Sequence, residues 1–538
     1  MRIADIVELN ARKAPARPAI CFAETDDVVS WGRLGERTAR LAQAIAALTE
    51  PGDRVAILAE NSAEYIECYY GVPDAGAALT LLNYRLHPRE WVWILNDASP
   101  KVLIADRKHV EMVLDLLPEI PSIRTVITIG EPLASTLSYE DLLRGARAER
   151  PGAPAGDRPG SLGERPAWIV YTSGTTGKPK GAMLSHRNIF TAVVQSVIHY
   201  GPSPEERFLN AMPLCHIAGY LVIVNQFRGG TVYLQAGWDP ERWMQVVDEH
   251  GITSGGSAPA MINMVLQHPK ISAYKLDSLT SVGYGAAIMP AEVLRAMIDR
   301  FGPVVYAGFG MTELAGNVLT LDKATHVRAA RGEEHLLAAT GSTMCMSDAQ
   351  VWDDNGAECP SGEVGEIVVK GDQTTMGYLG NEEATAAAYQ GGWFHTGDLA
   401  RRDDEGFFTI VDRKKDMIIT GGENVYSTEV ENAIYAHPAV AEVAVVGLPD
   451  DRWGEAVTAV VVLRPAASAT EEEIVAACRA SLAGFKRPRQ VYFADDLPRT
   501  VSGKVLKREL RERYRDRAPA PGRAGHDGAG AGGLRGAR

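Results

Sequence analysis

Residues 171–181 read Tyr-Thr-Ser-Gly-Thr-Thr-Gly-Lys-Pro-Lys-Gly. The apolar run 167–170 precedes them and predicts a buried strand, while Ser185 stands before an apolar-periodic segment and predicts the start of a helix. Three glycines in eight positions allow sharp turns that bring backbone N–H groups close to an anion. Hydroxyl and ammonium side chains add further donors and positive charge. The stretch is therefore suited to holding a polyphosphate.

The common nucleotide loop G-x-x-x-x-G-K-[ST] does not describe this stretch. Gly174 and Gly177 are too close together for that pattern, and Lys178 is followed by Pro179. Proline has no N–H and disfavours helical geometry in the residue before it. The sequence thus predicts a different phosphate loop, and a flexible surface loop of the same composition remains the alternative.

The composition indicates a globular protein with more than one domain. The chain has 538 residues, of which 46% are hydrophobic and 23% charged, and its net charge of −13 disfavours general binding to nucleic acid or anionic lipid. Six scattered cysteines fit a reducing compartment. Neither a signal peptide nor a membrane span is recognisable, so we expect a cytoplasmic protein.

Strand-like and helix-like segments alternate along the first part of the chain. Apolar runs at 55–58 and 102–105 predict buried strands, and Leu34 to Leu48 repeat at helical spacing. This alternation favours parallel sheets covered by helices. A smaller α+β unit follows, with helices expected at 428–435 and 471–482 and strands at 440–446 and 457–463.

Two further motifs have side chains that suit a nucleotide. In Gly308-Phe309-Gly310 an aromatic ring flanked by glycines offers a stacking face, and Thr312-Glu313 supplies oxygen ligands of the kind that Mg²⁺ prefers. A turn with a capping acid is the alternative. Asp398, after Thr396-Gly397, could accept both hydroxyls of a ribose.

The stretch 171–181 resembles the signature of adenylate-forming enzymes, which include acyl- and aryl-CoA synthetases, free-standing adenylation domains and beetle luciferases. The other motifs follow in that family's order, so the resemblance covers about residues 5 to 515. It implies an α/β fold with a large N-terminal domain of helix-covered mixed and parallel sheets, a small barrel-like subdomain and a small mobile α+β C-terminal domain. The implied boundaries are 1–412, a hinge at 413–416, the mobile domain at 417–516 and a disordered tail at 517–538.

The resemblance also implies roles for individual residues. The catalytic residues would be Lys504, Glu313, Thr312 and His216, with Glu313 as the metal ligand. The ATP phosphates would be bound by Thr172, Ser173, Gly174, Thr175, Thr176 and Lys180. Adenosine would be bound by Gly285, Ala286, Ala287, Gly308, Phe309, Gly310, Asp398 and Arg413. The hinge would be Lys415, and CoA would be bound by Gly421, Gly422, Glu423 and Lys486. The acyl pocket would be lined by His216, Tyr220, Ser257, Tyr284 and Ala307.

Some of these residues have ordinary alternatives. His216 lies between apolar residues and could be a satisfied core histidine, and the charge run 412–416 could be a solvated turn. Lys486 stands in a basic patch that could be a solvated loop. The chain departs from the family at Ile288, where proline is usual, and at Ala307, where glutamine is common.

The implied reaction is that of an AMP-forming acyl-CoA synthetase, with ATP, Mg²⁺ and CoA. A carboxylic acid and ATP give an acyl-adenylate and pyrophosphate, and the CoA thiol then displaces AMP. Transfer to an acyl carrier protein is the first alternative; a luciferase-like oxygenase and a non-catalytic nucleotide-binding protein are weaker ones. The motifs leave open whether the acid is a fatty, aryl, terpenoid or polyketide acid, and whether the protein is a monomer or a homodimer.

Overall fold

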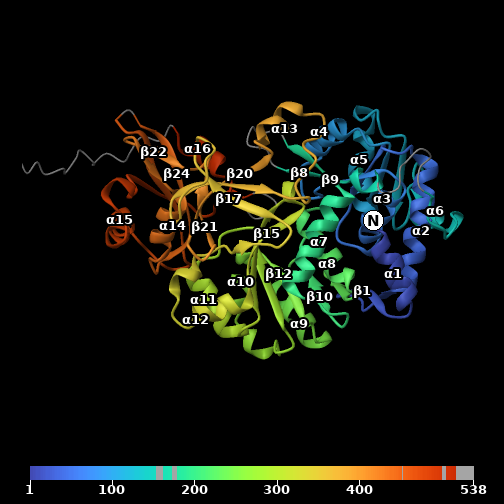
Figure 1. The fold of residues 1–538 in the computed structure, drawn as a ribbon, viewed down its shortest axis with the longest axis horizontal. Helices are drawn as coiled ribbons and strands as arrows, with labels where there is room; N and C mark the ends of the chain where they lie inside the picture. The colour runs from blue at the N-terminus through green and yellow to red at the C-terminus, as the bar shows by residue number, and fades with distance from the viewer. Residues whose placement is uncertain (153–160, 173–178, 451, 500–504, 516–538) are drawn as a thin grey trace, which may run out of the picture. The chain divides into compact units, whose positions relative to one another are not determined.

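The computed structural model describes residues 1–152, 161–172, 179–450, 452–499 and 505–515 (Figure 1). Its contacts divide the chain into two units, Met1–Ile410 and Val411–Arg538. Each unit has its own sheets and cores, and each is described by itself.

The first sheet of the N-terminal unit has seven strands, all parallel except the last, β9. The predicted buried strands at 55–58, 102–105 and 167–170 are its members β3, β5 and β8. In spatial order the strands are β7 (Leu137–Ser138), β6 (Thr125–Ile129), β5 (Val102–Asp106), β3 (Arg54–Leu58), β4 (Ala78–Leu81), β8 (Pro166–Thr172) and β9 (Lys180–Ser185).

The second sheet has nine strands with a parallel centre and antiparallel edges. Its parallel part runs from β14 to β1. In spatial order the strands are β16 (Ser342–Thr343), β15 (Gly316–Leu321), β14 (Val305–Met311), β13 (Ser281–Gly285), β12 (Ser254–Ser257), β10 (Arg207–Asn210), β11 (Thr231–Leu234), β1 (Pro18–Phe22) and β2 (Val28–Ser30).

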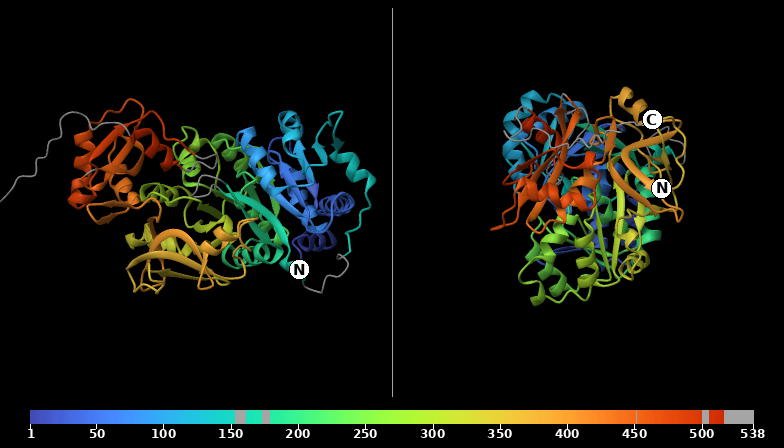
Figure 2. Two further views of the ribbon diagram at one scale, coloured as in Figure 1. Left: turned by 90° about the horizontal axis from the view of Figure 1, so that it is seen from above. Right: turned by 90° about the vertical axis from the view of Figure 1, so that its left-hand side faces the viewer.

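Helices fill the space between these two sheets and cover their outer faces. The shared core combines both sheets with α1 (Asp5–Lys13), α2 (Trp31–Leu48), α3 (Ala63–Asp74), α7 (His186–Tyr200) and α8 (Tyr220–Phe227). Figure 2 shows the first sheet with its helices (blue to cyan) beside the central strands of the second sheet (green).

The outer faces bury separate cores. The first sheet packs against α4 (Pro88–Ala98) and α5 (Arg107–Val113). The second packs against α9 (Pro240–His250), α10 (Pro259–Leu266), α11 (Ala291–Phe301) and α12 (Lys323–Ala330). The remaining helices of this unit are α6 (Tyr139–Gly145) and α13 (Glu382–Ala388). The predicted cap of α7 is present, because Ser185 Oγ accepts from the backbone N–H of Asn188.

A third sheet corresponds to the predicted barrel-like subdomain. It has five strands, which are β17 (Asp348–Trp352), β18 (Val364–Lys370), β19 (Tyr389–Gln390), β20 (Trp393–Arg402) and β21 (Phe408–Arg413). Its core includes Leu314, Val318 and Leu319, so the third sheet packs against β15 and the turn between β14 and β15.

The C-terminal unit is the expected α+β unit. Its strands are β22 (Ile418–Thr420), β23 (Glu423–Val425), β24 (Val440–Asp450), β25 (Gly454–Leu463) and β26 (Gln490–Phe493). One face packs against α14 (Ser427–Tyr435) and α15 (Glu471–Ala477), and the other against α16 (Lys507–Tyr514). The helix expected at 471–482 is shorter, since its last turn, Cys478–Ala480, is a 3-10 helix.

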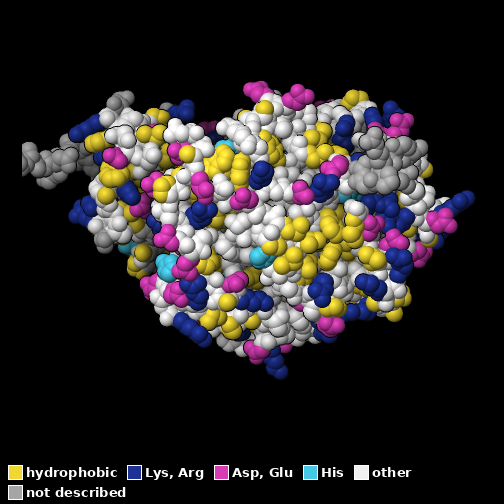
Figure 3. Space-filling view, viewed as in Figure 1, with side chains coloured by type: hydrophobic (Ala, Val, Ile, Leu, Met, Phe, Trp, Pro, Cys, Tyr) yellow, Lys and Arg dark blue, Asp and Glu magenta, His cyan; other side chains and the backbone are white. Residues whose placement is uncertain are grey.

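The surface carries both signs of charge. Acidic and basic side chains are interspersed over the visible face (Figure 3). Among the described helices, none is long and apolar enough to cross a lipid bilayer.

Candidate active site

Glu313 lies where three parts of the N-terminal unit meet. Strand β14 ends at Met311, and the 3-10 turn Thr312–Leu314 follows. Glu313 is buried, with only 6% of the residue exposed. Its Oε1 accepts hydrogen bonds from the Tyr378 hydroxyl at 3.0 Å and the Thr172 hydroxyl at 3.5 Å. The site therefore contains a buried carboxylate held by hydroxyl donors.

The β8–β9 hairpin connects this carboxylate to the predicted phosphate loop. Thr172, the last residue of β8, pairs with Lys180, the first residue of β9. The segment between them contains Ser173, Gly174, Thr175 and Thr176, which lie outside the described residues. Both described ends of the loop thus lie beside Glu313 or its neighbour Tyr378: the Lys180 ammonium is 5.1 Å from the centre of the Tyr378 ring.

Tyr378 is the functional candidate that the sequence analysis missed. The segment 376–379 runs along β9, with the N–H of Met376 donating to Met183 and that of Leu379 to Gly181. Burial raises the pKa of Tyr378 well above its usual value, and the charge of Glu313 raises it further. Its hydroxyl therefore stays protonated and donates to Glu313. The available signal was Gly377-Tyr378-Leu379-Gly380, an aromatic residue near glycines as at Phe309.

The glycines of the Gly308-Phe309-Gly310 motif are required by packing. A Cβ on Gly308 would lie 2.1 Å from Asn317 Nδ2, and one on Gly310 would lie 1.9 Å from the Gly316 carbonyl oxygen. Phe309 is half-buried and packs against the core of the third sheet. The motif therefore has a structural role in addition to any contact with adenine.

Gly285, Ala286 and Ala287 lie at the carboxyl end of β13. Ala286 and Ala287 are exposed, and Ala286 has a φ of +67°. A Cβ on Gly285 would lie 2.5 Å from the Gly308 carbonyl oxygen. Ligands of open α/β sheets bind outside the carboxyl ends of the strands, which is where these small residues are.

Asp398 is buried within β20, next to a glycine with positive φ. Gly397 has a φ of +73°, and its N–H donates to Glu366 Oε1 at 2.9 Å. The pairing of β18 with β20 shifts register at this level. Glu366, which sequence reasoning also missed, thus holds the irregular part of β20 that precedes Asp398.

The five residues predicted to line the acyl pocket do not share one face of the second sheet. Tyr220 is buried on the α7–α8 side, where its hydroxyl accepts from the Asn317 N–H at 3.3 Å. Strand pairing aligns Ser257, Tyr284 and Ala307 on the other side, where Tyr284 and Ala307 belong to the core beneath α9 to α12. The Tyr284 hydroxyl lies 3.1 Å from Nε2 of His326, a residue of α12.

The reason is the two-residue alternation of strands. Because Gly308 is adjacent to Ala307, the two residues point to opposite faces. The resemblance therefore grouped residues that lie on different sides of this sheet, and their role as an acyl pocket stays a prediction. His216 is half-buried at the start of the 3-10 turn Ile217–Gly219, which leads into α8.

Gly421 and Gly422 of the C-terminal unit form the turn between β22 and β23. Their φ angles are +62° and +85°, a conformation that favours glycine at both positions. A Cβ on Gly421 would also lie 2.9 Å from the Trp453 ring. Glu423, which follows, is exposed. The turn itself thus accounts for the two glycines.

Lys486, the other predicted CoA contact, already has an anionic partner. Its Nζ lies 2.8 Å from both carboxylate oxygens of Glu429. A CoA phosphate at this position would have to compete with that carboxylate.

The predicted hinge adjoins a buried charge cluster of the C-terminal unit. The carboxylate of Asp412 accepts from the N–H of Arg413 at 2.7 Å and from the Ser427 hydroxyl at 3.0 Å. Lys507 Nζ lies 2.7 Å from Glu431 and donates to Ser427. Burial would lower the pKa of Lys507, but the charges of Glu431 and Asp412 raise it above its usual value. Lys415 lies in this unit, and Lys504 lies outside the described residues.

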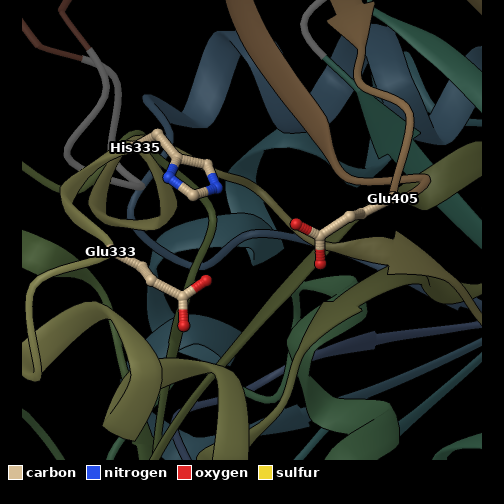
Figure 4. A group of neighbouring side chains, drawn as sticks. All are labelled: Glu333, His335 and Glu405. Atoms are coloured by element: carbon tan, nitrogen blue, oxygen red, sulfur yellow. The ribbon is translucent and has the colours of Figure 1, made fainter.

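One other group of side chains in the described part of the chain has the composition of a metal site. Glu333 and His335 follow α12 and face Glu405 from the loop after β20 (Figure 4). The Arg328 guanidinium lies 2.5 Å from Glu333 and 2.9 Å from Glu405. Both carboxylates thus have a cationic partner within the protein.

Comparison with known proteins shows the family. The sequence matches the AMP-binding enzyme family over residues 7–379 and the AMP-binding enzyme C-terminal domain over residues 429–504. It is 38% identical to a feruloyl-CoA synthase from Amycolatopsis sp. over 511 residues, which cover 94% of this chain and 97% of the relative. It is 35% identical to the medium/long-chain-fatty-acid–CoA ligase FadD8 from Mycobacterium tuberculosis, over 93% of this chain and 87% of the relative.

A solved structure supports the same assignment. The crystal structure of ATP-bound MatB from Rhodopseudomonas palustris aligns with a TM-score of 0.86 and 31% identity, over 96% of this chain and 99% of MatB. The predicted resemblance and α/β fold are confirmed, and AMP-forming acyl-CoA synthetase activity is the activity that these matches support. The chain belongs to the family of AMP-binding enzymes.

Proposed function

We propose that the protein activates a carboxylic acid with ATP at the Glu313 site and transfers the acyl group to CoA. The acid and ATP form an acyl-adenylate with release of pyrophosphate. The CoA thiol then attacks the acyl carbon, and AMP leaves. The observation that carries this proposal is the meeting of Glu313, Tyr378, Thr172 and Lys180 at both ends of the loop 173–178.

The first step needs alignment and charge neutralisation more than acid–base chemistry. A carboxylate oxygen attacks the α-phosphorus in line with the departing pyrophosphate, and both reactants are anions. In the proposed arrangement the segment 172–180, with its hydroxyls and Lys180, holds the β- and γ-phosphates. His216 lies at the acid side, and Lys504 bridges the carboxylate and the α-phosphate.

Glu313 is the proposed ligand of Mg²⁺. Its carboxylate is buried and receives hydrogen bonds from two hydroxyl groups, so a hard anionic oxygen is held in position. The Thr312 hydroxyl is adjacent. Such oxygen ligands fit Mg²⁺, which when bound would offset the charge of the ATP phosphates. The residues of the chain thus fit the ion that the reaction class requires.

The remaining assignments also stay proposals. Gly285 to Ala287 and Gly308 to Gly310 would accommodate adenine, and Asp398 and Arg413 would bind the ribose. Lys415 would be the hinge about which the C-terminal unit exchanges Lys504 for the Gly421–Glu423 turn before CoA reacts. We propose that the reaction takes place in the cytoplasm, where ATP and CoA are available.

CoA is preferred over a carrier protein because both sequence relatives described above are named as CoA enzymes. The test uses the purified chain with a panel of acids. We expect acid-dependent ATP–pyrophosphate exchange, and then AMP release and thioester formation with free CoA. If none of the acids supported ATP–pyrophosphate exchange, the adenylation proposal would be refuted. If a thioester formed only on a phosphopantetheinylated carrier protein, the acceptor would be the carrier protein and not CoA.

A further inference from the structure

Glycines line the face of the second sheet that is turned toward α7 and α8. Strand pairing places Gly256 of β12 level with Gly283 of β13, which is level with Tyr306 of β14. One pair nearer the carboxyl ends, Gly285 is level with Gly308. Among these paired residues of β12, β13 and β14, Tyr306 is therefore the large side chain on this face.

The Tyr306 ring lies over its neighbouring strand. A Cβ on Gly283 would be 2.6 Å from both Cζ and the hydroxyl oxygen of Tyr306, so the ring occupies the space that the glycine leaves. On its other side the ring stacks against Tyr200, the last residue of α7, with centroids 4.6 Å apart and planes inclined by 37°. The two rings therefore extend from the sheet to the helix layer.

Hydrogen bonds hold this aromatic pair in place. The Tyr200 hydroxyl accepts from Asn317 Nδ2 at 2.8 Å. Asn317 is itself fixed, because its N–H donates to the Tyr220 hydroxyl at 3.3 Å and its carbonyl accepts from Gln195 Nε2 at 2.8 Å. The wall is thus part of a network that includes α7, α8 and β15.

Tyr306 separates two regions along the strands. Toward the carboxyl ends lie Gly308 and the turn that carries Glu313, where the acid is proposed to react. Toward the amino ends lies a small hollow bounded by Tyr306 and by side chains of α8 and neighbouring strands, which include Phe208, Leu221, Val224, Ser254 and Ser281. Over Gly308 the side chains of Asn317 and Tyr200 occupy this face, because a Cβ there would lie 2.1 Å from Asn317 Nδ2 and 2.9 Å from the Tyr200 hydroxyl oxygen. A straight acyl chain that entered from the carboxyl end would therefore meet these side chains and the Tyr306 ring before it reached the hollow.

We propose that Tyr306 is the end wall of the acid pocket and that the enzyme therefore accepts compact, ring-bearing acids and rejects long straight-chain fatty acids. The inference rests on the proposed function. An aromatic wall offers a flat face for a second ring, whereas a long chain has no path past it. The relatives do not decide this point, since one is named for ferulate and another for medium- and long-chain fatty acids.

The test is the acid profile of ATP–pyrophosphate exchange in the wild type, Tyr306→Ala and Tyr306→Phe. The panel contains benzoate, cinnamate and 4-hydroxycinnamate together with octanoate, dodecanoate and hexadecanoate. We expect the wild-type kcat/KM for cinnamate to exceed that for dodecanoate by about tenfold or more, since one buried ring decides the fit. Tyr306→Ala, which opens the path to the hollow, should reduce this ratio by about tenfold, and Tyr306→Phe, which keeps the ring, should preserve it.

Two results would overturn the inference. One is a wild-type enzyme that uses hexadecanoate as well as cinnamate, and the other is a folded Tyr306→Ala variant with an unchanged ratio. If Tyr306→Ala does not fold, Tyr200→Ala removes the other half of the wall and should shift the ratio in the same direction. If no acid of the panel supported exchange, the proposed function would be refuted instead, so the two failures are distinguishable.

Discussion

The N-terminal unit accommodates acidic side chains in two different ways. The Glu313 carboxylate is buried, and the partners that the structure gives it are the hydroxyls of Tyr378 and Thr172. Glu333 and Glu405 are more exposed and share the Arg328 guanidinium. Neutral donors hold a carboxylate while leaving its charge available to a ligand, whereas a guanidinium neutralises it. Proximity of acidic groups therefore does not by itself identify a metal site.

The largest expected effect is that of Glu313→Gln. This change keeps the shape of the side chain and removes its charge, so we expect acid-dependent ATP–pyrophosphate exchange to fall by on the order of 10²–10³, as for loss of one key electrostatic contact. A variant with wild-type exchange would show that Glu313 is only a structural acid, which would remove its contrast with Glu333 and Glu405.

His186 offers a second buried titratable group, in this case one that the fold keeps neutral. Burial and, to a smaller extent, the charge of nearby Arg2 lower its pKa from 6.5 to about 4, while the charge of Asp5 opposes this shift. The unfolded chain then binds the extra proton first as pH falls, so stability is lost between about pH 6.5 and pH 4, by up to about 3 kcal/mol.

Denaturant unfolding at several pH values measures this loss. His186→Gln cannot titrate and should show a flatter dependence over the same interval than the wild type. Parallel curves for the two proteins would mean that other groups cause the acid sensitivity.

A smaller effect is expected from Tyr378→Phe. Removing a hydrogen bond to a carboxylate costs about 1.5 kcal/mol, so exchange activity should fall about tenfold. Tyr139→Phe is the matched control, because its hydroxyl donates to the buried Glu67 carboxylate at 2.8 Å outside the proposed site. It should lower stability and spare activity. Equal losses of activity in both variants would show a general packing effect.

The smallest effect is expected from Glu405→Gln. One half of a surface ion-pair cluster contributes less than about 1 kcal/mol, so activity should stay within about twofold and the unfolding free energy should change little. A large loss of activity would place chemistry at the Glu333–His335–Glu405 group and reverse the comparison.

The sequence allowed the local elements and the main motifs to be predicted, because both depend on short-range patterns. Apolar runs identified β3, β5 and β8, and Ser185 marked the start of α7. The hydroxyl-rich loop and Glu313 were selected from residue types at close spacing, and their binding roles stay predictions. In the C-terminal unit the same patterns predicted α14, α15, β24 and β25, whereas β22, β23, β26 and α16 were not predicted.

Contacts between distant segments could not be predicted in this way. Tyr378 reaches Glu313 only because the segment 376–379 runs along β9, and Glu366 supports Gly397 only because β18 pairs with β20. The face of Tyr284 likewise depends on sheet register. Strand pairing, which a single sequence does not reveal, decides each of these positions.

The most direct test of the account is metal–nucleotide binding measured with Mn²⁺ as a paramagnetic substitute for Mg²⁺. Binding of Mn²⁺ in the presence of ATP can be followed by electron paramagnetic resonance in the wild type, Glu313→Gln and Glu405→Gln. We expect Glu313→Gln to weaken binding by about tenfold or more through loss of a charged ligand, and Glu405→Gln to leave it within about twofold. Weakened binding in Glu405→Gln with unchanged binding in Glu313→Gln would contradict the account.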